Sequence, residues 1–121
     1  MKFMLLIYSP DGAGPTPGTP EFAAQRAAWF SVTEELAAAG HLVAGDALQA
    51  IDTATTVRVR GGEKLTTDGP FAETKEMLGG YYLIDVDTLD EALAWSAKMP
   101  NIGYGSVEVR PIMELSMDGA G

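Results

Sequence analysis

The sequence contains no cysteine and only one histidine, His41. The absence of cysteine excludes disulfides and thiolate chemistry. Metal centres in proteins need several ligands, so a single histidine does not indicate a metal site. We interpret His41 as an ordinary residue at the end of the helix, directly after Gly40. The G-x-S-x-G, H-E-x-x-H and phosphate-loop motifs are also missing. We therefore predict no metal and no other cofactor.

Positive charge is scarce, because 8 lysines and arginines stand against 17 acidic residues, for a net charge of −9. Binding to nucleic acid or to an anionic membrane surface requires clustered cationic side chains, so neither is predicted as a partner. No apolar run approaches the roughly 20 residues of a membrane-spanning helix. The short apolar run near the N-terminus is not followed by a signal-peptide cleavage site, and we expect a cytoplasmic protein.

The length of 121 residues and the apolar content of 46% predict one globular domain. A chain of this size can bury a hydrophobic core, although a modest one. We place the domain at residues 1–115 and expect residues 116–121 to form a frayed tail.

The first half of the chain shows a β-α-β pattern. Residues 2–8 are apolar on both faces, which is typical of a strand in a sheet that is covered on both sides. A Gly- and Pro-rich loop leads to a helix that begins after the N-cap Thr19 and ends at Gly40. Residues 42–49 form the next predicted strand, in which Gly45 marks a candidate bulge.

A hairpin and a second β-α-β pattern follow. The hairpin strands at 55–60 and 64–67 are predicted to pair across the tight turn at Gly61-Gly62. A T-x-x-E capping box opens the second helix, and a proline closes it. The remaining strand, helix and strand are predicted at residues 81–86, 89–99 and 106–115.

This order of elements predicts an α+β protein with a ferredoxin-like βαββαβ fold and an inserted hairpin. Both helices would then cover one face of an antiparallel sheet. On the other face Met4, Leu6 and Leu83 need burial, and an exposed apolar patch of that size indicates a partner. We predict a homodimer in which the two sheets face each other.

Six segments of the chain carry a family resemblance: MKFMLLIY, LVAGDALQ, TATTVRVR, DGPFAETKEMLGGYYLIDV, LDEALAWSAKMP and VEVRPIME. In this order they resemble the YCII-related family, specifically its DGPF-domain branch, over nearly the whole domain. The resemblance implies a dimeric α+β barrel built from two ferredoxin-like protomers. It also implies candidate partners and activities: some relatives are regarded as small-molecule enzymes, including a dehydrochlorinase-type lyase. Some DGPF proteins are encoded beside extracytoplasmic-function sigma factors.

The sequence departs from the enzyme branches of that family at two positions. Those branches pair a histidine in the first helix with an aspartate just before the proline that follows the second helix. This chain offers Gln25 and Arg26 in the first helix, and Met99 precedes Pro100. The acid–base mechanism of those relatives is therefore not carried over.

The DGPFAETKE stretch, residues 68–76, has two interpretations. In the structural one, Asp68 accepts backbone N–H groups, Gly69 adopts a positive φ and Phe71 anchors the turn in the core. In the functional one, the turn borders the cleft between the two sheets, where Asp68 acts as a general base and Lys75 binds an anionic group. The ligand-binding candidates of this turn are Gly69, Pro70, Phe71, Glu73 and Lys75.

Polar residues on the face away from the helices form a second candidate group. Strand alternation directs Tyr8, Tyr81, Asp85, Glu108 and Arg110 toward the facing sheet. The candidate bulge at Gly45 leaves the facing of Asp46 open. Glu108 and Arg110 either neutralise each other or line a pocket in which Arg110 binds an anionic ligand. In that pocket the candidate catalytic groups for proton transfer are Asp46, Asp68 and Asp85.

Three functions remain open at this point. In the first, the dimer cleft binds a small organic molecule and acts on it by cofactor-independent acid–base chemistry. In the second, the protein is a regulatory module that works with a sigma factor through protein contacts. In the third, the cleft is only structural. Perturbed carboxylate pKa values inside a pocket distinguish the first from the second. Substrate and reaction do not follow from the sequence.

Overall fold

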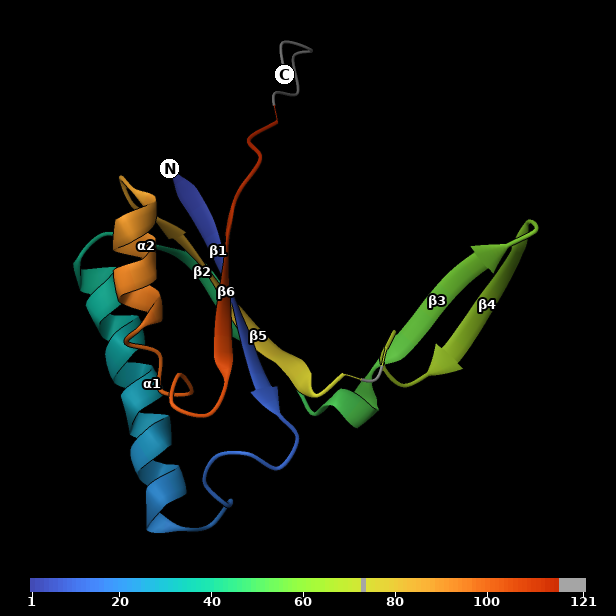
Figure 1. Ribbon diagram of the computed structural model, residues 1–121, viewed down its shortest axis with the longest axis horizontal. Helices are drawn as coiled ribbons and strands as arrows, with labels where there is room; N and C mark the ends of the chain where they lie inside the picture. The colour runs from blue at the N-terminus through green and yellow to red at the C-terminus, as the bar shows by residue number, and fades with distance from the viewer. Residues whose placement is uncertain (73, 116–121) are drawn as a thin grey trace.

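The computed structural model describes residues 1–72 and 74–115. It has mixed α+β architecture, as predicted (Figure 1). The elements are β1 (Lys2–Pro10), α1 (Pro20–Ala38), β2 (Leu42–Ala47), the short 3₁₀ helix η1 (Ile51–Thr53), β3 (Thr55–Arg60), β4 (Glu63–Asp68), β5 (Glu76–Asp85), α2 (Leu89–Ser96) and β6 (Ser106–Pro111).

Four strands form one sheet in the order β2-β5-β1-β6, and each neighbouring pair is antiparallel. Strands β1 and β2 therefore run parallel on the two sides of β5, and α1 connects them. Strands β5 and β6 are related in the same way through β1 and α2. Both helices lie on one side of the sheet (Figure 1).

The core lies between the helices and β1. Phe3, Leu5 and Ile7 alternate toward the helices and are buried, which is the period of two expected for a strand. Val32 and Leu36 of α1 pack against them, together with residues from β5, from α2 and from the segments that follow these two elements. The full cluster contains Phe3, Leu5, Ile7, Val32, Leu36, Ile84, Val86, Ala92 and Met99.

The helix ends confirm the sequence signals. The Thr19 side chain accepts a hydrogen bond from the N–H of Phe22 at 3.2 Å, and Thr88 caps α2 in the same way. Gly40 has φ +78°, and its N–H donates to the carbonyl of Ala37 at 3.0 Å. The chain thus leaves α1 through a left-handed residue, a conformation that glycine adopts at little cost.

Several predicted boundaries are wrong. Strand β5 begins at Glu76 rather than at residue 81, so Gly79 and Gly80 lie inside the strand instead of preceding it. The last strand ends at Pro111, not at residue 115. The irregularity in β2 falls between Leu42 and Ala44 rather than at Gly45.

Strands β3 and β4 form a separate two-stranded sheet, which we call the arm (residues 55–68). Gly61 and Gly62 have φ +60° and +80°, as a tight hairpin turn requires. The arm extends away from the four-stranded sheet on the side opposite the helices (Figure 1).

Gly80 permits the close contact between β5 and β2, and its replacement tests that constraint. A Cβ at position 80 would lie 2.8 Å from the carbonyl oxygen of Asp46 and 3.3 Å from the Cα of Ala47. Both atoms are main chain, so relief requires the strands to separate. We expect Gly80→Ala to lower the free energy of unfolding by about 2 kcal/mol in urea denaturation.

The neighbouring glycine provides the matched control. A Cβ at Gly79 would meet its nearest atom, the carbonyl oxygen of Ile7, at 3.9 Å, an ordinary contact. Gly79→Ala should therefore change stability by no more than about 0.5 kcal/mol. Equal losses for the two variants would contradict the close-contact explanation.

Candidate functional site

A pocket of about 520 Å³ lies between α1 and the sheet. This volume is typical of sites for small organic ligands. Helix α1 forms one wall, and the facing strands and the loop after α2 form the other. The lining residues are Ile7, Ser9, Gln25, Arg26, Trp29, Phe30, Thr33, Gly45, Asp46, Ala47, Gly79, Gly80, Tyr81, Tyr82, Asn101 and Tyr104.

Aromatic rings dominate one side of this pocket. The rings of Trp29 and Tyr82 are stacked, with centroids 6.4 Å apart and an interplanar angle of 25°. The Tyr82 hydroxyl shares a 2.7 Å hydrogen bond with the hydroxyl of Thr33, which fixes the ring against α1. The guanidinium of Arg26 lies 5.8 Å from the ring centre of Phe30. The arrangement offers flat apolar surface beside a positive charge.

A smaller pocket of about 300 Å³ adjoins the first near the start of α1. The two pockets share Gln25, Arg26, Trp29 and Tyr104. The amide of Gln25 donates to the Tyr104 hydroxyl, so helix α1 and the loop after α2 are linked at the boundary. The two hollows therefore form one extended region beside the same helix.

The pocket exists because small residues face α1 from the sheet. Gly45 and Gly80 sit where the register places helix-facing side chains, opposite Tyr82 and Ile7 respectively. A Cβ at Gly45 would approach the Tyr82 ring to 2.8 Å. Glycine at this position therefore lets the ring lie flat against β2.

Asn101 is a site residue that the sequence analysis missed. It is only 1% exposed, and its Nδ2 donates to the carbonyl oxygen of Tyr8 at 2.9 Å. Its Oδ1 has no hydrogen-bond partner within the described residues. Asn101 thus ties the loop after α2 to β1 at the pocket edge. The sequence signal was weak, since asparagine after proline reads as an ordinary turn residue.

Two of the predicted site residues do come together. The hydroxyl of Tyr81 donates to the carboxylate of Asp46 at 2.7 Å. The hydrogen bond and the negative charge of Asp46 raise the pKa of Tyr81 above its ordinary value. Asp46 pairs with Tyr81, and Tyr81 pairs with Leu6, so both side chains lie on the face opposite the helices. Both residues are nevertheless among those that line the pocket.

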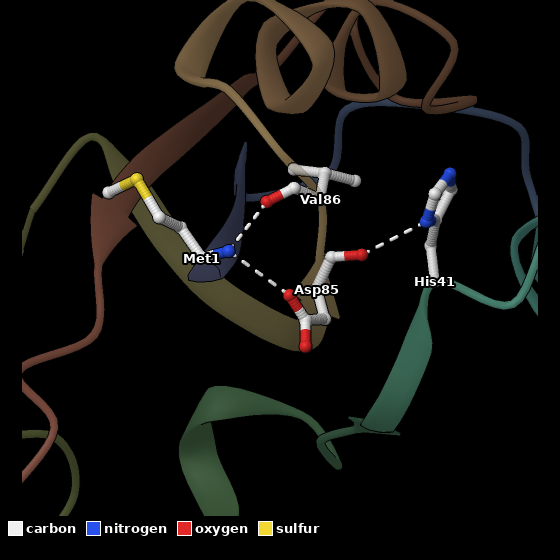
Figure 2. A network of polar contacts seen from close by, with 4 residues as sticks. All are labelled: Met1, His41, Asp85 and Val86. Atoms are coloured by element: carbon white, nitrogen blue, oxygen red, sulfur yellow. Dashed lines mark hydrogen bonds and ion pairs between the residues drawn. The ribbon is translucent and has the colours of Figure 1, made fainter.

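Tyr8, Glu108 and Arg110 also lie on the open face. The Tyr8 hydroxyl donates to Glu108 Oε1 at a long 3.4 Å, and Arg110 stands opposite Met4 in the register. Asp85 lies at the far end of β5, where its carboxylate pairs with the amino group of Met1 at 3.2 Å. His41 Nδ1 donates to the Asp85 carbonyl at 2.9 Å, as Figure 2 shows. The cleft predicted here requires a second copy of the chain and stays a prediction.

The DGPF turn lies at the base of the arm and does not line either pocket. Asp68 ends β4, and Gly69 has φ +102°. Phe71 is 73% exposed, so the prediction that it anchors the turn in the core is wrong. Its ring packs under Arg58 instead, at 5.0 Å from the guanidinium carbon to the ring centre. Of the other predicted residues, Pro70 is half-buried, Lys75 is exposed and Glu73 lies outside the described residues.

Residues 1–72 and 74–115 contain no group of three or more acidic, histidine or cysteine side chains arranged to hold a metal ion. Within the same residues, neither helix has the length and apolar content needed to cross a bilayer.

Comparison with known proteins places the chain. The model of the YCII-related domain matches residues 1–116. The chain belongs to the YCII-related family. An uncharacterized protein of Rhizobium meliloti (strain 1021) is 52% identical over 61 residues, which span 49% of each chain. The alignment thus covers about half the length of this curated relative.

A solved structure supports the fold of this YCII-related protein. It is 5-chloro-2-hydroxyhydroquinone dehydrochlorinase (TftG) from Burkholderia phenoliruptrix AC1100, in complex with 2,5-dihydroxybenzoquinone. The TM-score is 0.51 at 17% sequence identity, over 93% of this chain and 94% of the other. At this identity the likeness concerns the fold alone.

The Asp46–Tyr81 contact can be tested by titration. Replacing Asp46 with asparagine removes the negative charge, so we expect the pKa of Tyr81 to fall toward its ordinary value. Ultraviolet absorbance of tyrosinate measures this, and Tyr81→Phe identifies which transition belongs to Tyr81. An unchanged transition in Asp46→Asn would contradict the contact.

The same contact predicts a pH dependence of stability. The folded-state pKa of Tyr81 is raised above its unfolded value of about 10, so the folded state keeps this proton to higher pH. The contribution to stability is fully present below the unfolded pKa and is lost as pH rises through the folded pKa. Because the hydrogen bond is exposed to solvent, the change in stability should be small, and it should vanish in Tyr81→Phe.

Proposed function

We propose that this YCII-related protein binds a small planar organic molecule in the pocket between α1 and the sheet. The observation that carries the proposal is the stacked pair of Trp29 and Tyr82 in a pocket of ligand size. A flat ring packed against these side chains would release water from the face that they cover, and aromatic contacts of this kind favour offset stacking.

The pocket also holds the means to bind polar groups. Arg26 lines both hollows, and it forms no ion pair with the described residues. A guanidinium in that position can bind an anionic or strongly polarised oxygen with two parallel hydrogen bonds. Gln25 and Tyr104 supply further donors and acceptors at the boundary between the hollows.

Two comparisons support this choice of site and ligand class. The helix that carries the histidine in the enzyme branches of the family presents Gln25 and Arg26 here, and both line the pocket. The structurally similar TftG is named as a complex with 2,5-dihydroxybenzoquinone, a planar oxygenated ring. An aromatic wall beside a cation is suited to bind a ring of that class.

The proposal is for binding rather than for the acid–base reaction. Met99, which stands where the enzyme relatives carry aspartate, is buried in the core. Asp46 is the one carboxylate residue among those that line the larger pocket, and its side chain lies on the other face of the sheet. General acid–base catalysis needs a titratable group within hydrogen-bond reach of the substrate. The sigma-factor alternative stays a prediction.

We also propose that two copies pair through the open face of the sheet, as in a dimeric α+β barrel. The strand order β2-β5-β1-β6, with two β-α-β units, supports the ferredoxin-like protomer that such a barrel requires. Met4 and Leu83 pair with each other on that face, beside Leu6, and all three are half-buried in the single chain. In the pair, Asp46, Tyr81, Glu108 and Arg110 would border the space between the sheets.

Ligand binding is tested with Trp29→Leu. We expect 2,5-dihydroxybenzoquinone, used as the probe, to bind the native protein in isothermal titration calorimetry. Loss of the ring contact should weaken binding at least tenfold, which corresponds to about 1.4 kcal/mol. Trp95→Leu is the matched control, because Trp95 packs against the same core without lining either pocket.

Three results would count against the binding proposal. They are absence of binding by this quinone, equal weakening in both tryptophan variants, and full binding in Trp29→Leu. Circular dichroism at the titration temperature verifies that each variant is folded.

Pairing through the open face is tested with Leu83→Lys. A lysine at the centre of the apolar contact would bury an unpaired charge, so we expect a dimer in the native protein and a monomer in the variant. Sedimentation equilibrium measures both. Leu93→Lys places the same charge on the exposed side of α2 and should leave the dimer intact. A monomeric native protein at micromolar concentration would refute the pairing.

A further inference from the structure

We propose that the arm, residues 55–68, docks on a second copy of the chain and holds the pair together. This inference deepens the pairing proposed above and rests on it. The arm is the inserted hairpin, and neither the ligand pocket nor the core uses it.

The arm has almost no support from its own chain. Val57 and Val59 are 58% and 59% exposed, and Leu65 is exposed as well. All six residues of β4 are exposed, and both strands have an open edge. An isolated two-stranded hairpin is marginally stable in water at best. Its apolar residues therefore indicate a covering surface outside the protomer.

The charge of the arm favours another copy of this acidic chain as the partner that covers it. The arm contains Arg58, Arg60 and Lys64 but only Glu63 and Asp68 as acidic residues. It thus holds three of the 8 cationic residues and two of the 17 acidic ones. The rest of the chain is strongly acidic, so the arm of one copy is attracted to the body of another. Such attraction acts over roughly 10 Å at moderate ionic strength.

The position of the arm agrees with this partner. It projects on the side of the sheet away from the helices (Figure 1), which is the side where Met4, Leu6 and Leu83 lie. A copy seated on these residues would therefore stand on the same side as the arm. One partner can cover both exposed surfaces.

The DGPF turn braces the arm at its base. Arg58 packs over the Phe71 ring and donates to the Phe71 carbonyl oxygen at 3.3 Å. The Thr56 hydroxyl donates to the carbonyl of Gly69 at 2.9 Å, and the Gly69 N–H donates to Ala54 at 2.6 Å. These contacts hold the hairpin against the segments that enter and leave it, at Ala54 and at residues 69–71. They give the turn a role in aiming the arm rather than in chemistry.

Removal of the arm tests the proposal. Ala54 and Gly69 are already joined by a hydrogen bond, so residues 55–68 can be replaced by two glycines without moving the ends. We expect the dimer dissociation constant, measured by sedimentation equilibrium, to rise at least tenfold. Circular dichroism and thermal melting show whether the shortened chain is folded.

A charge reversal keeps the test decisive if the shortened chain fails to fold. Arg60 is exposed, and its guanidinium donates to the adjacent carbonyl of Val59 at 2.9 Å. Arg60→Glu should weaken the dimer at least fivefold at low salt. Lys98→Glu, on the helix side of the sheet, makes the same change in net charge. It removes the surface ion pair that Lys98 forms with Glu35. It should leave the dissociation constant within twofold.

The outcomes separate this proposal from the pairing itself. If the native protein is a dimer that Leu83→Lys dissociates, unchanged dissociation constants in the folded arm variants would overturn the arm contact alone. Equal weakening by Arg60→Glu and Lys98→Glu would assign the effect to net charge and overturn it too. A monomeric native protein would overturn both the pairing and the arm contact, and would leave the arm to a different partner.

Discussion

The alternation of β1 is the constraint on which the rest of the structure depends. Phe3, Leu5 and Ile7 bury one face of this strand against two helices, and apolar burial of this kind is the main driving force of folding. The same pleat necessarily directs Met4 and Leu6 to the opposite face. A chain that forms its own core therefore presents a second apolar surface that it does not itself cover.

The glycines of the sheet shape the ligand pocket. Core residues fill the space under the C-terminal half of α1, where Val32 and Leu36 are buried. Under the N-terminal half, Gly45 and Gly80 face the helix, and the space between them and Trp29 remains hollow. Close packing elsewhere keeps the hollow from collapsing. The hollow is thus a consequence of which strand positions lack a side chain.

The two faces of the sheet have different roles in this account. The helix side holds a pocket within one chain, whereas the open side and the arm are suited to contact with a second copy. Asp46 and Tyr81 belong to both regions, since the two residues line the pocket while their hydrogen-bonded side chains lie on the open face.

Local patterns in the sequence determined the elements, the caps at Thr19 and Thr88, the Gly61-Gly62 turn and the two-faced β1, because each depends on neighbours within a few residues. The face on which Asp46 lies was left open, since a single bulge reverses the direction of every later side chain. Phe71 and Asn101 were decided only by the tertiary structure. The phenylalanine is exposed because its turn belongs to a projecting arm, and the asparagine is buried because β1, distant in sequence, lies across it. Burial is set by contacts between distant segments, which a pattern of adjacent residues does not contain.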